Sequence, residues 1–112
     1  MTTDPLFGKA TWKSSMLEKE FHEQVAHVMR LNGWSVYSVP DSRRVSLAGY
    51  PDITAWRGNR LIFAELKREK GKTSPAQDEV LGELRLIPCA EVYLWKPSDW
   101  DTIEAIISRR NA

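Results

Sequence analysis

The amino-acid sequence predicts an α/β protein with the element order α-β-β-β-α-β-α. Two observations lead to this prediction. Three segments carry apolar residues at helical spacing, and four short segments are rich in β-forming residues. The chain has 112 residues, 42% of them hydrophobic and 28% charged, which fits one ordinary globular domain. Its formal net charge is +1, so any surface that binds an anionic partner has to be local.

The first helix is expected to run from about Met16 to Leu31, with Ser15 as its N-cap. Asn32-Gly33 then ends it. Residues 1–14 are polar with scattered proline and glycine, and we expect them to form a flexible arm. The apolar face of the helix consists of Leu17, Phe21, Val25, Val28 and Met29.

Four strands are expected, at residues 34–39, 52–56, 60–67 and 91–95. The loop between the first two strands, residues 40–50, carries Arg43 and Arg44 side by side. After the third strand, Ser74-Pro75-Ala76-Gln77 predicts a helix start, because serine can cap, proline suits the first helical position and glutamine can close a capping box. The last helix is expected to begin at residues 98–101.

The second and third strands are predicted to form a hairpin, and its turn determines which residues face each other. Gly58-Asn59 suits a two-residue turn of the primed type, which needs positive φ. Counting outward from this turn along both strands, Asp52 faces Glu65. Lys67 lies two residues beyond Glu65 and therefore shares the same face of the sheet.

This pairing indicates a functional site, because like charges directly opposite each other destabilise a sheet. Two carboxylates at that distance should share a proton or bind a cation, and magnesium prefers carboxylate oxygen. Lys67 would then orient a water molecule or stabilise charge on a phosphate, which favours metal-assisted phosphodiester hydrolysis. The alternative is structural: Asp52 simply begins a strand, and Glu65 with Lys67 forms a solvated face.

Pro51-Asp52, followed after twelve residues by Glu65-Leu66-Lys67, resembles the motif of the PD-(D/E)xK nucleases. The continuation from Gly71 to Gln77 resembles the VRR-NUC branch of that superfamily, in its small stand-alone phage and bacterial form. The resemblance extends from Leu17 to about Ile107. It implies a restriction-endonuclease-like core with a mixed central sheet flanked by helices, and a single nuclease domain over residues 15–112.

The resemblance also implies functional roles for individual residues. Mg²⁺ would be the cofactor, with Mn²⁺ able to replace it, and no organic cofactor is expected. The implied metal ligands are Asp52, Glu65, the backbone carbonyl of Leu66 and an acid of the first helix, Glu18. Lys67 would be the catalytic lysine, and Gln77 would contact metal-bound water or phosphate.

Two of these roles have structural alternatives. Ser15 and Glu18 also fit a capping box, so Glu18 could serve the helix start instead of the site. Gln77 could close the box with Ser74 and take no part in chemistry, or could do both.

Basic residues around the motif predict a DNA-binding rim. If both segments border the site, the cationic side chains would hold backbone phosphates. We expect DNA contacts from Arg43, Arg44, Lys70, Lys72 and Ser74, although Lys70 also fits a solvated turn.

The sequence therefore predicts a metal-dependent DNA endonuclease, specific for structure such as a junction or branch. A homodimer is implied by the resemblance. One alternative is a DNA-binding module of the same fold with little or no catalysis, and another is a structural subunit that dimerises through a sheet edge or the last helix. No signal peptide or membrane span is visible, and the single Cys89 excludes an internal disulfide. We expect a cytoplasmic protein of a bacterium or a phage-infected host.

Overall fold

The computed structural model describes residues 13, 15–39 and 46–110. The predicted order α-β-β-β-α-β-α is confirmed, and in the described ranges a turn of 3₁₀-helix precedes the last helix. The elements are α2 (Glu18–Leu31), β1 (Ser35–Ser38), β2 (Ile53–Arg57), β3 (Arg60–Leu66), α3 (Pro75–Leu84), β4 (Ala90–Trp95), η3 (Pro97–Asp99) and α4 (Trp100–Ser108). No helix in these ranges is long and apolar enough to span a membrane.

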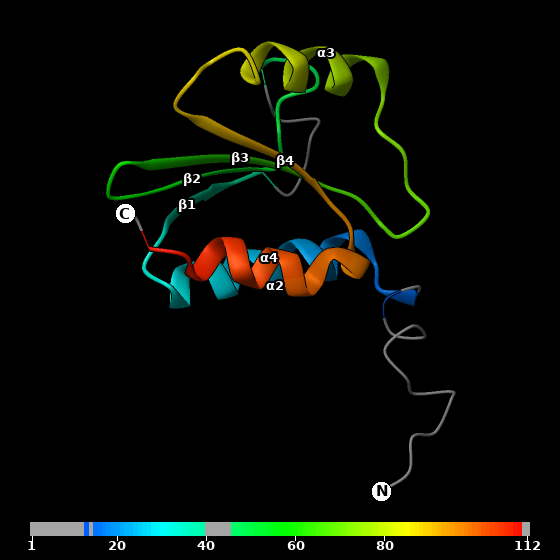
Figure 1. Ribbon diagram of the computed structural model, residues 1–112. Coiled ribbons are helices and arrows are strands. Elements are labelled where there is room, and N and C mark those ends of the chain that lie inside the picture. The colour runs from blue at the N-terminus through cyan, green and yellow to red at the C-terminus, as the bar shows by residue number, and fades with distance from the viewer. Residues whose placement is uncertain (1–12, 14, 40–45, 111–112) are drawn as a thin grey trace, which may run out of the picture.

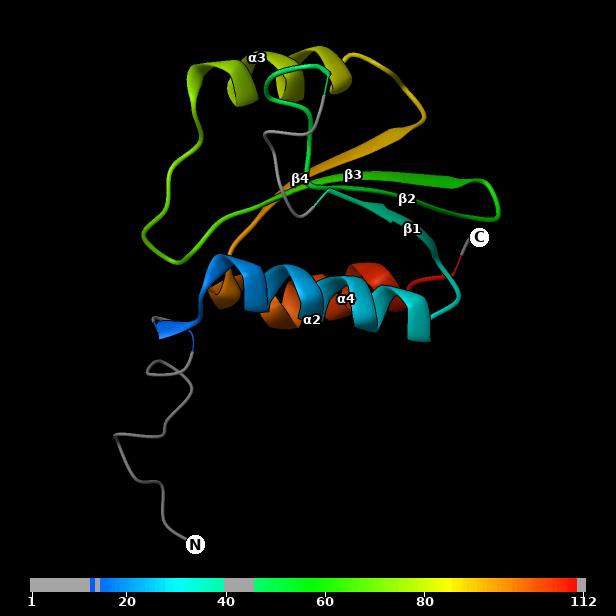
Figure 2. The same ribbon diagram turned by 180° about the vertical axis from the view of Figure 1, so that it is seen from behind.

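The four strands form one mixed sheet in the order β1-β2-β3-β4. β2 pairs antiparallel with both β1 and β3, whereas β3 and β4 are parallel. Parallel neighbours need a crossover connection, and α3 supplies it. α3 lies on one face of the sheet, and α2 and α4 lie side by side on the other (Figures 1 and 2).

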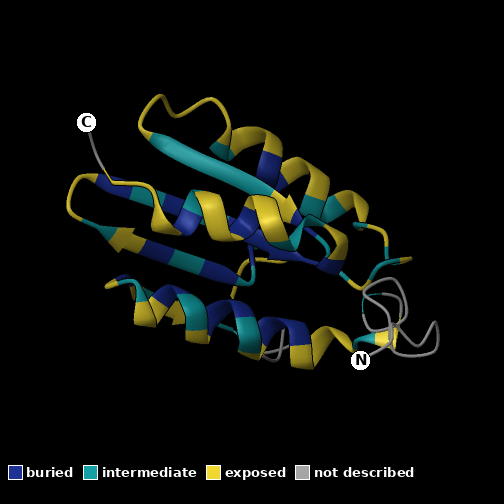
Figure 3. Ribbon diagram, turned by 60° about the horizontal axis from the view of Figure 1, so that its bottom comes forward, coloured by how far each residue is buried: buried dark blue, intermediate teal, exposed yellow. Residues whose placement is uncertain are grey.

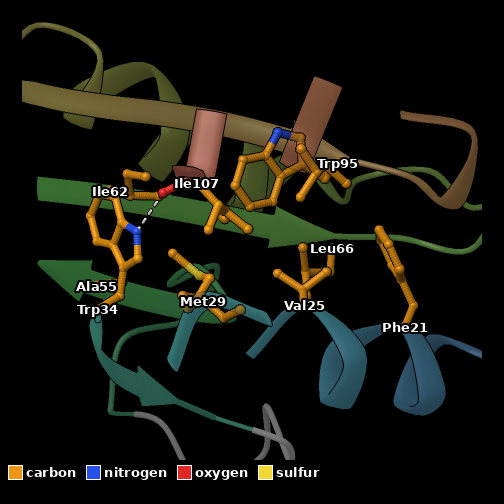
Figure 4. Packing of buried hydrophobic residues seen from close by; sticks show 12 residues of the cluster. Phe21, Val25, Met29, Trp34, Ala55, Ile62, Leu66, Trp95 and Ile107 are labelled. Atoms are coloured by element: carbon orange, nitrogen blue, oxygen red, sulfur yellow. Dashed lines mark hydrogen bonds between the residues drawn. The ribbon is translucent and has the colours of Figure 1, made fainter. Parts of the chain in front are cut away.

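The main core lies between the sheet and the α2–α4 layer. The helices turn their buried sides toward the sheet and their exposed sides outward (Figure 3). Strand residues whose side chains point into this core alternate with residues that point toward the α3 side. The core consists of Phe21, Val25, Met29, Trp34, Ile53, Ala55, Ile62, Ala64, Leu66, Trp95, Ile103 and Ile107 (Figure 4).

The start of the first helix differs from the prediction. α2 begins at Glu18 and its N-cap is Leu17, which has extended backbone angles. The backbone N–H of Leu17 donates to Oε1 of Glu20 at 3.0 Å, so Glu20 rather than Glu18 closes the first turn. The side chain of Leu17 is exposed, contrary to its expected place on the apolar face.

The hairpin end of the sheet is tied to the C-terminal end of α4 by two arginines. The guanidinium carbons of Arg57 and Arg60 lie 4.7 and 4.8 Å from the ring centroid of Trp34. Trp34 Nε1 donates to the carbonyl of Ile107 at 2.9 Å (Figure 4). Arg60 is bound through two hydrogen bonds to Glu91, at 2.8 and 2.7 Å. Neighbouring arginines are tolerated here because an anion, carbonyl groups and an aromatic ring surround them.

Candidate active site

The predicted hairpin register is confirmed, and it brings Asp52 next to β3. The pairs run from Arg57 with Arg60 to Ile53 with Ala64, so the next pair outward is Asp52 with Glu65. Oδ2 of Asp52 accepts a hydrogen bond of 2.9 Å from the backbone N–H of Leu66. The turn has positive φ at Gly58 but not at Asn59, which is the pattern of a type II′ turn.

Glu65 is the most buried acid of the described chain. Its side chain is only 1% exposed. Oε2 accepts from Nε2 of Gln77 at 2.9 Å and lies 3.3 Å from Nζ of Lys67. Oε1 is buried and has no hydrogen-bond partner among the described residues. Burial raises the pKa of the Glu65 carboxyl to about 8; the charge of Asp52 adds to the rise, and Lys67 opposes it.

Lys67 extends the pairing of β3 with β4 by one residue, and its amine lies beside Glu65 of the acid pair. Its backbone N–H donates to the carbonyl of Trp95 at 3.0 Å, which extends the parallel ladder beyond Leu66. The side chain is 13% exposed, so the amine is largely withdrawn from water. The strand ends of β3 and β4 thus hold Lys67 beside Glu65, as the spacing of two residues predicts.

The first turn of α3 confirms the capping alternative for Gln77 and adds a contact with Glu65. Its Oε1 accepts from the backbone N–H of Ser74 at 2.8 Å, while Oγ of Ser74 accepts from the backbone N–H of Gln77 at 3.2 Å. This is the predicted capping box. The amide nitrogen of the same Gln77 side chain donates to Glu65, so one side chain both caps α3 and holds the buried acid.

The segment that leads into Asp52 is fixed by contacts of Tyr50 and Val39. The hydroxyl of Tyr50 lies 2.6 Å from Oγ1 of Thr54, and its ring meets Phe63 edge-on at 6.4 Å. The backbone carbonyl of Asp52 accepts from the N–H of Val39 at 2.9 Å. Asp52 is therefore held from both sides, at its backbone carbonyl by Val39 and at its carboxylate by the N–H of Leu66.

Glu18 remains a prediction. It is exposed at the start of α2, in the helix layer on the face of the sheet opposite α3 (Figure 1). In the described ranges, no hydrogen bond or ion pair joins it to Asp52 or Glu65. Nor do those ranges contain a group of three or more His, Cys, Asp or Glu side chains that could hold a metal ion.

The expected basic rim is described in part. Arg68, Lys70 and Lys72 are all exposed in the connection between β3 and α3, and Ser74 is exposed at its end. Oε1 of Glu69 accepts from the backbone N–H of Ser98 at 2.9 Å, which ties this connection to η3. Arg43 and Arg44 lie outside the described residues.

The two acids fit a hard divalent cation. Mg²⁺ prefers oxygen ligands and is usually held by one or two carboxylates, with water and substrate phosphate completing its shell. Asp52 and Glu65 supply such a pair, and the buried Oε1 of Glu65 is an acceptor that no donor of the described chain satisfies. A buried acceptor of this kind is stabilised when a cation binds next to it.

Comparison with known proteins gives no further guide to the site. No protein-family model, curated protein or solved structure matches this chain. The chemistry has to be inferred from the arrangement of Asp52, Glu65, Lys67 and Gln77.

Proposed function

We propose that the protein is a divalent-metal-dependent DNA endonuclease that hydrolyses phosphodiester bonds. The observation that carries this proposal is the Glu65 carboxyl group, which is buried beside a second acid, Asp52, and next to Lys67. A buried acid beside a second acid is costly to ionise and is typical of functional sites.

Asp52 and Glu65 would hold Mg²⁺, or Mn²⁺ in its place, with the backbone carbonyl of Leu66 as a further ligand. When bound, the metal would polarise a phosphoryl oxygen and lower the pKa of a water molecule. The hydrogen bond from Leu66 N–H to Oδ2 fixes the Asp52 carboxylate, and Gln77 fixes one oxygen of Glu65. Both acids are therefore oriented before a ligand arrives.

Lys67 would stabilise the negative charge that develops on the phosphate during hydrolysis. Its amine lies 3.3 Å from Glu65 Oε2 and is mostly shielded from water, where a fixed positive charge acts most strongly. The N-terminus of α3 lies beside the same acid through Gln77, and the positive end of the helix dipole favours a phosphate.

DNA is the proposed substrate, cut at a structure such as a junction or branch. The exposed Arg68, Lys70 and Lys72 directly follow Lys67 and would contact backbone phosphates, together with Arg43 and Arg44. The resemblance to VRR-NUC nucleases supports this substrate, a restriction-endonuclease-like core and a homodimer. It also supports a place of action in the cytoplasm of a bacterium or an infected host.

A DNA-binding module without strong catalysis is the second candidate. The observation in its favour is the ion pair between Lys67 and Glu65, which already supplies a positive charge to the buried acid without a metal. In that case the basic residues would bind DNA, and the acid pair with Lys67 would have no catalytic role.

The test is a cleavage assay with supercoiled plasmid and a panel of branched and linear DNAs, in Mg²⁺, Mn²⁺ or chelator. Asp52→Asn and Lys67→Met are compared with Glu104→Gln and Lys19→Met, which change exposed helix residues. We expect metal-dependent cutting that both site variants reduce by about 10²-fold or more, and that both controls retain. Wild-type protein that binds these DNAs but cuts none with either metal would favour the binding module.

A further inference from the structure

Gly49 packs against the first turn of α3, three residues before Asp52. Its φ is +87°, and a Cβ atom built on it would lie 2.3 Å from the carbonyl oxygen of Ala76 and 2.9 Å from the backbone nitrogen of Gln77. Ordinary contacts of a Cβ begin at 3.4 Å. Any larger residue would therefore have to push the peptide between Ala76 and Gln77 away by about 1 Å.

This contact joins the two segments that build the acid pair. On one side, the backbone continues from Gly49 into Asp52. On the other side, the contacted peptide carries Gln77, whose amide reaches Glu65 Oε2 at 2.9 Å. A hydrogen bond stretched by about 1 Å from that length is lost, so the close approach of Gly49 and the bond to Glu65 depend on each other.

The segment around Gly49 is tied to β2 through Tyr50, so a collision strains the first turn of α3. Tyr50 N–H donates to the carbonyl of Leu47 at 3.2 Å, and the Tyr50 hydroxyl is bound to Thr54 on β2. The first turn of α3 depends instead on the Ser74–Gln77 cap, which lies at the exposed end of a loop.

We propose that Gly49 is a positioning residue. Because glycine has no Cβ, α3 can approach until Gln77 binds Oε2 of Glu65. Oε1 then remains as the Glu65 oxygen that would bind the metal. The consequence for the metal rests on the function proposed above, whereas the consequence for Gln77 does not. Gly49 itself touches neither the metal nor the DNA in this account.

Gly33 provides a matched control. Its φ is +86°, nearly the same as that of Gly49, but a Cβ there would meet only Cδ of Arg57, at an ordinary 3.7 Å. Gly33→Ala therefore imposes the strain of a left-handed backbone without the collision, and Gly49→Ala imposes both. Any effect that Gly49→Ala shows and Gly33→Ala does not can therefore be assigned to the collision with α3.

The first measurement is the NMR signal of the Gln77 side-chain amide in metal-free protein, assigned through Gln77→Ala. We expect a hydrogen-bonded, slowly exchanging amide in the wild type and in Gly33→Ala, and its loss in Gly49→Ala. An amide signal that is unchanged in Gly49→Ala overturns the proposal. If Gly49→Ala does not fold, Gly49→Asn takes its place, because asparagine tolerates positive φ while carrying the same Cβ.

The second measurement is Mn²⁺ affinity by calorimetry. We expect Gly49→Ala to weaken Mn²⁺ binding about tenfold and Gly33→Ala to leave it unchanged. In protein that already carries Gln77→Ala, adding Gly49→Ala should weaken the binding little further. Equal affinity of Gly49→Ala and wild type overturns the proposal, as does the same loss with and without Gln77. If the wild type binds no Mn²⁺ but the amide signals behave as expected, the proposed nuclease function is refuted and the positioning role of Gly49 is still supported.

Discussion

Gln77 and Glu65 are joined by a hydrogen bond of 2.9 Å that runs from the first turn of α3 to the end of β3. The oxygen of the same Gln77 amide accepts from the backbone N–H of Ser74 and completes the capping box of the helix. The stability of α3 and the orientation of the buried acid are therefore linked through one side chain.

Replacing Gln77 with alanine should cost both stability and activity. The loss of the Gln77 half of the capping box should lower the free energy of unfolding by about 1 kcal/mol. The loss of the bond to Glu65 should in addition weaken metal binding and slow cleavage. Denaturant unfolding and the cleavage assay, carried out on the same preparation, measure the two effects.

Asp99→Ala is the control for this prediction. Oδ2 of Asp99 accepts from the backbone N–H of Lys96 at 2.9 Å, so the variant also removes one bond between a side chain and a helix start, but at η3. It should lose a similar amount of stability and keep full cleavage activity per folded molecule. Equal loss of activity in both variants would show that Gln77 acts only through stability.

The stability of the metal-free protein should fall as the pH rises from about 4.5 to about 8. Burial raises the pKa of Glu65 to about 8, above its ordinary value of 4.5. Between these values the folded state binds more protons than the unfolded state, so the free energy of unfolding decreases with pH, by a few kcal/mol in total. Unfolding curves in urea across this range, in the presence of chelator, measure the slope.

Glu65→Gln should remove most of this pH dependence, since an amide does not titrate. Glu104→Gln, which changes an exposed acid of α4, should leave the slope as it is. A metal-free protein whose stability is constant or rises through this range would mean that Glu65 is charged in the fold at neutral pH.

The Arg60–Glu91 pair should be important for stability and irrelevant to the site. The Arg60 side chain is only 6% exposed, and Glu91→Ala would leave its guanidinium without its carboxylate partner, which is 21% exposed. We expect a loss of about 3–5 kcal/mol in the free energy of unfolding, with cleavage unchanged where the variant is folded. Thermal and urea unfolding are the measurements.

Arg109→Ala is the matched variant for that pair. Arg109 also contacts Glu91, at 3.2 Å, but its side chain is 58% exposed. Its removal should cost less than about 1 kcal/mol. Similar losses from Glu91→Ala and Arg109→Ala would contradict a special role for the buried pair.

The hairpin and its acid pair could be predicted from the sequence because their causes are local. The Gly58-Asn59 turn fixes the register, and strand alternation then places Asp52, Glu65 and Lys67 on one face. The capping box of Ser74 and Gln77 is equally local, since both partners lie within one helical turn.

Other features depend on contacts between distant segments and leave little trace in one sequence. A glycine in a loop is common, so nothing marks Gly49 as the residue that meets Ala76. Arg57 and Arg60 look like two opposed like charges until Trp34 and Glu91 are placed around them. The predicted start of α2 was wrong because Ser15 and Glu18 fit a capping box in sequence, whereas the structure closes the first turn through the backbone N–H of Leu17 and the side chain of Glu20.

The central claim is that Asp52 and Glu65 form a divalent-cation site, and calorimetric titration with Mn²⁺ tests it most directly. The wild type and Glu104→Gln should bind the ion, and their melting temperatures should rise with its concentration, because a ligand that binds only the folded state stabilises it. Asp52→Asn and Glu65→Gln should show neither effect while remaining folded. Absence of binding by folded wild-type protein, or equal binding by the two acid variants, would contradict the account.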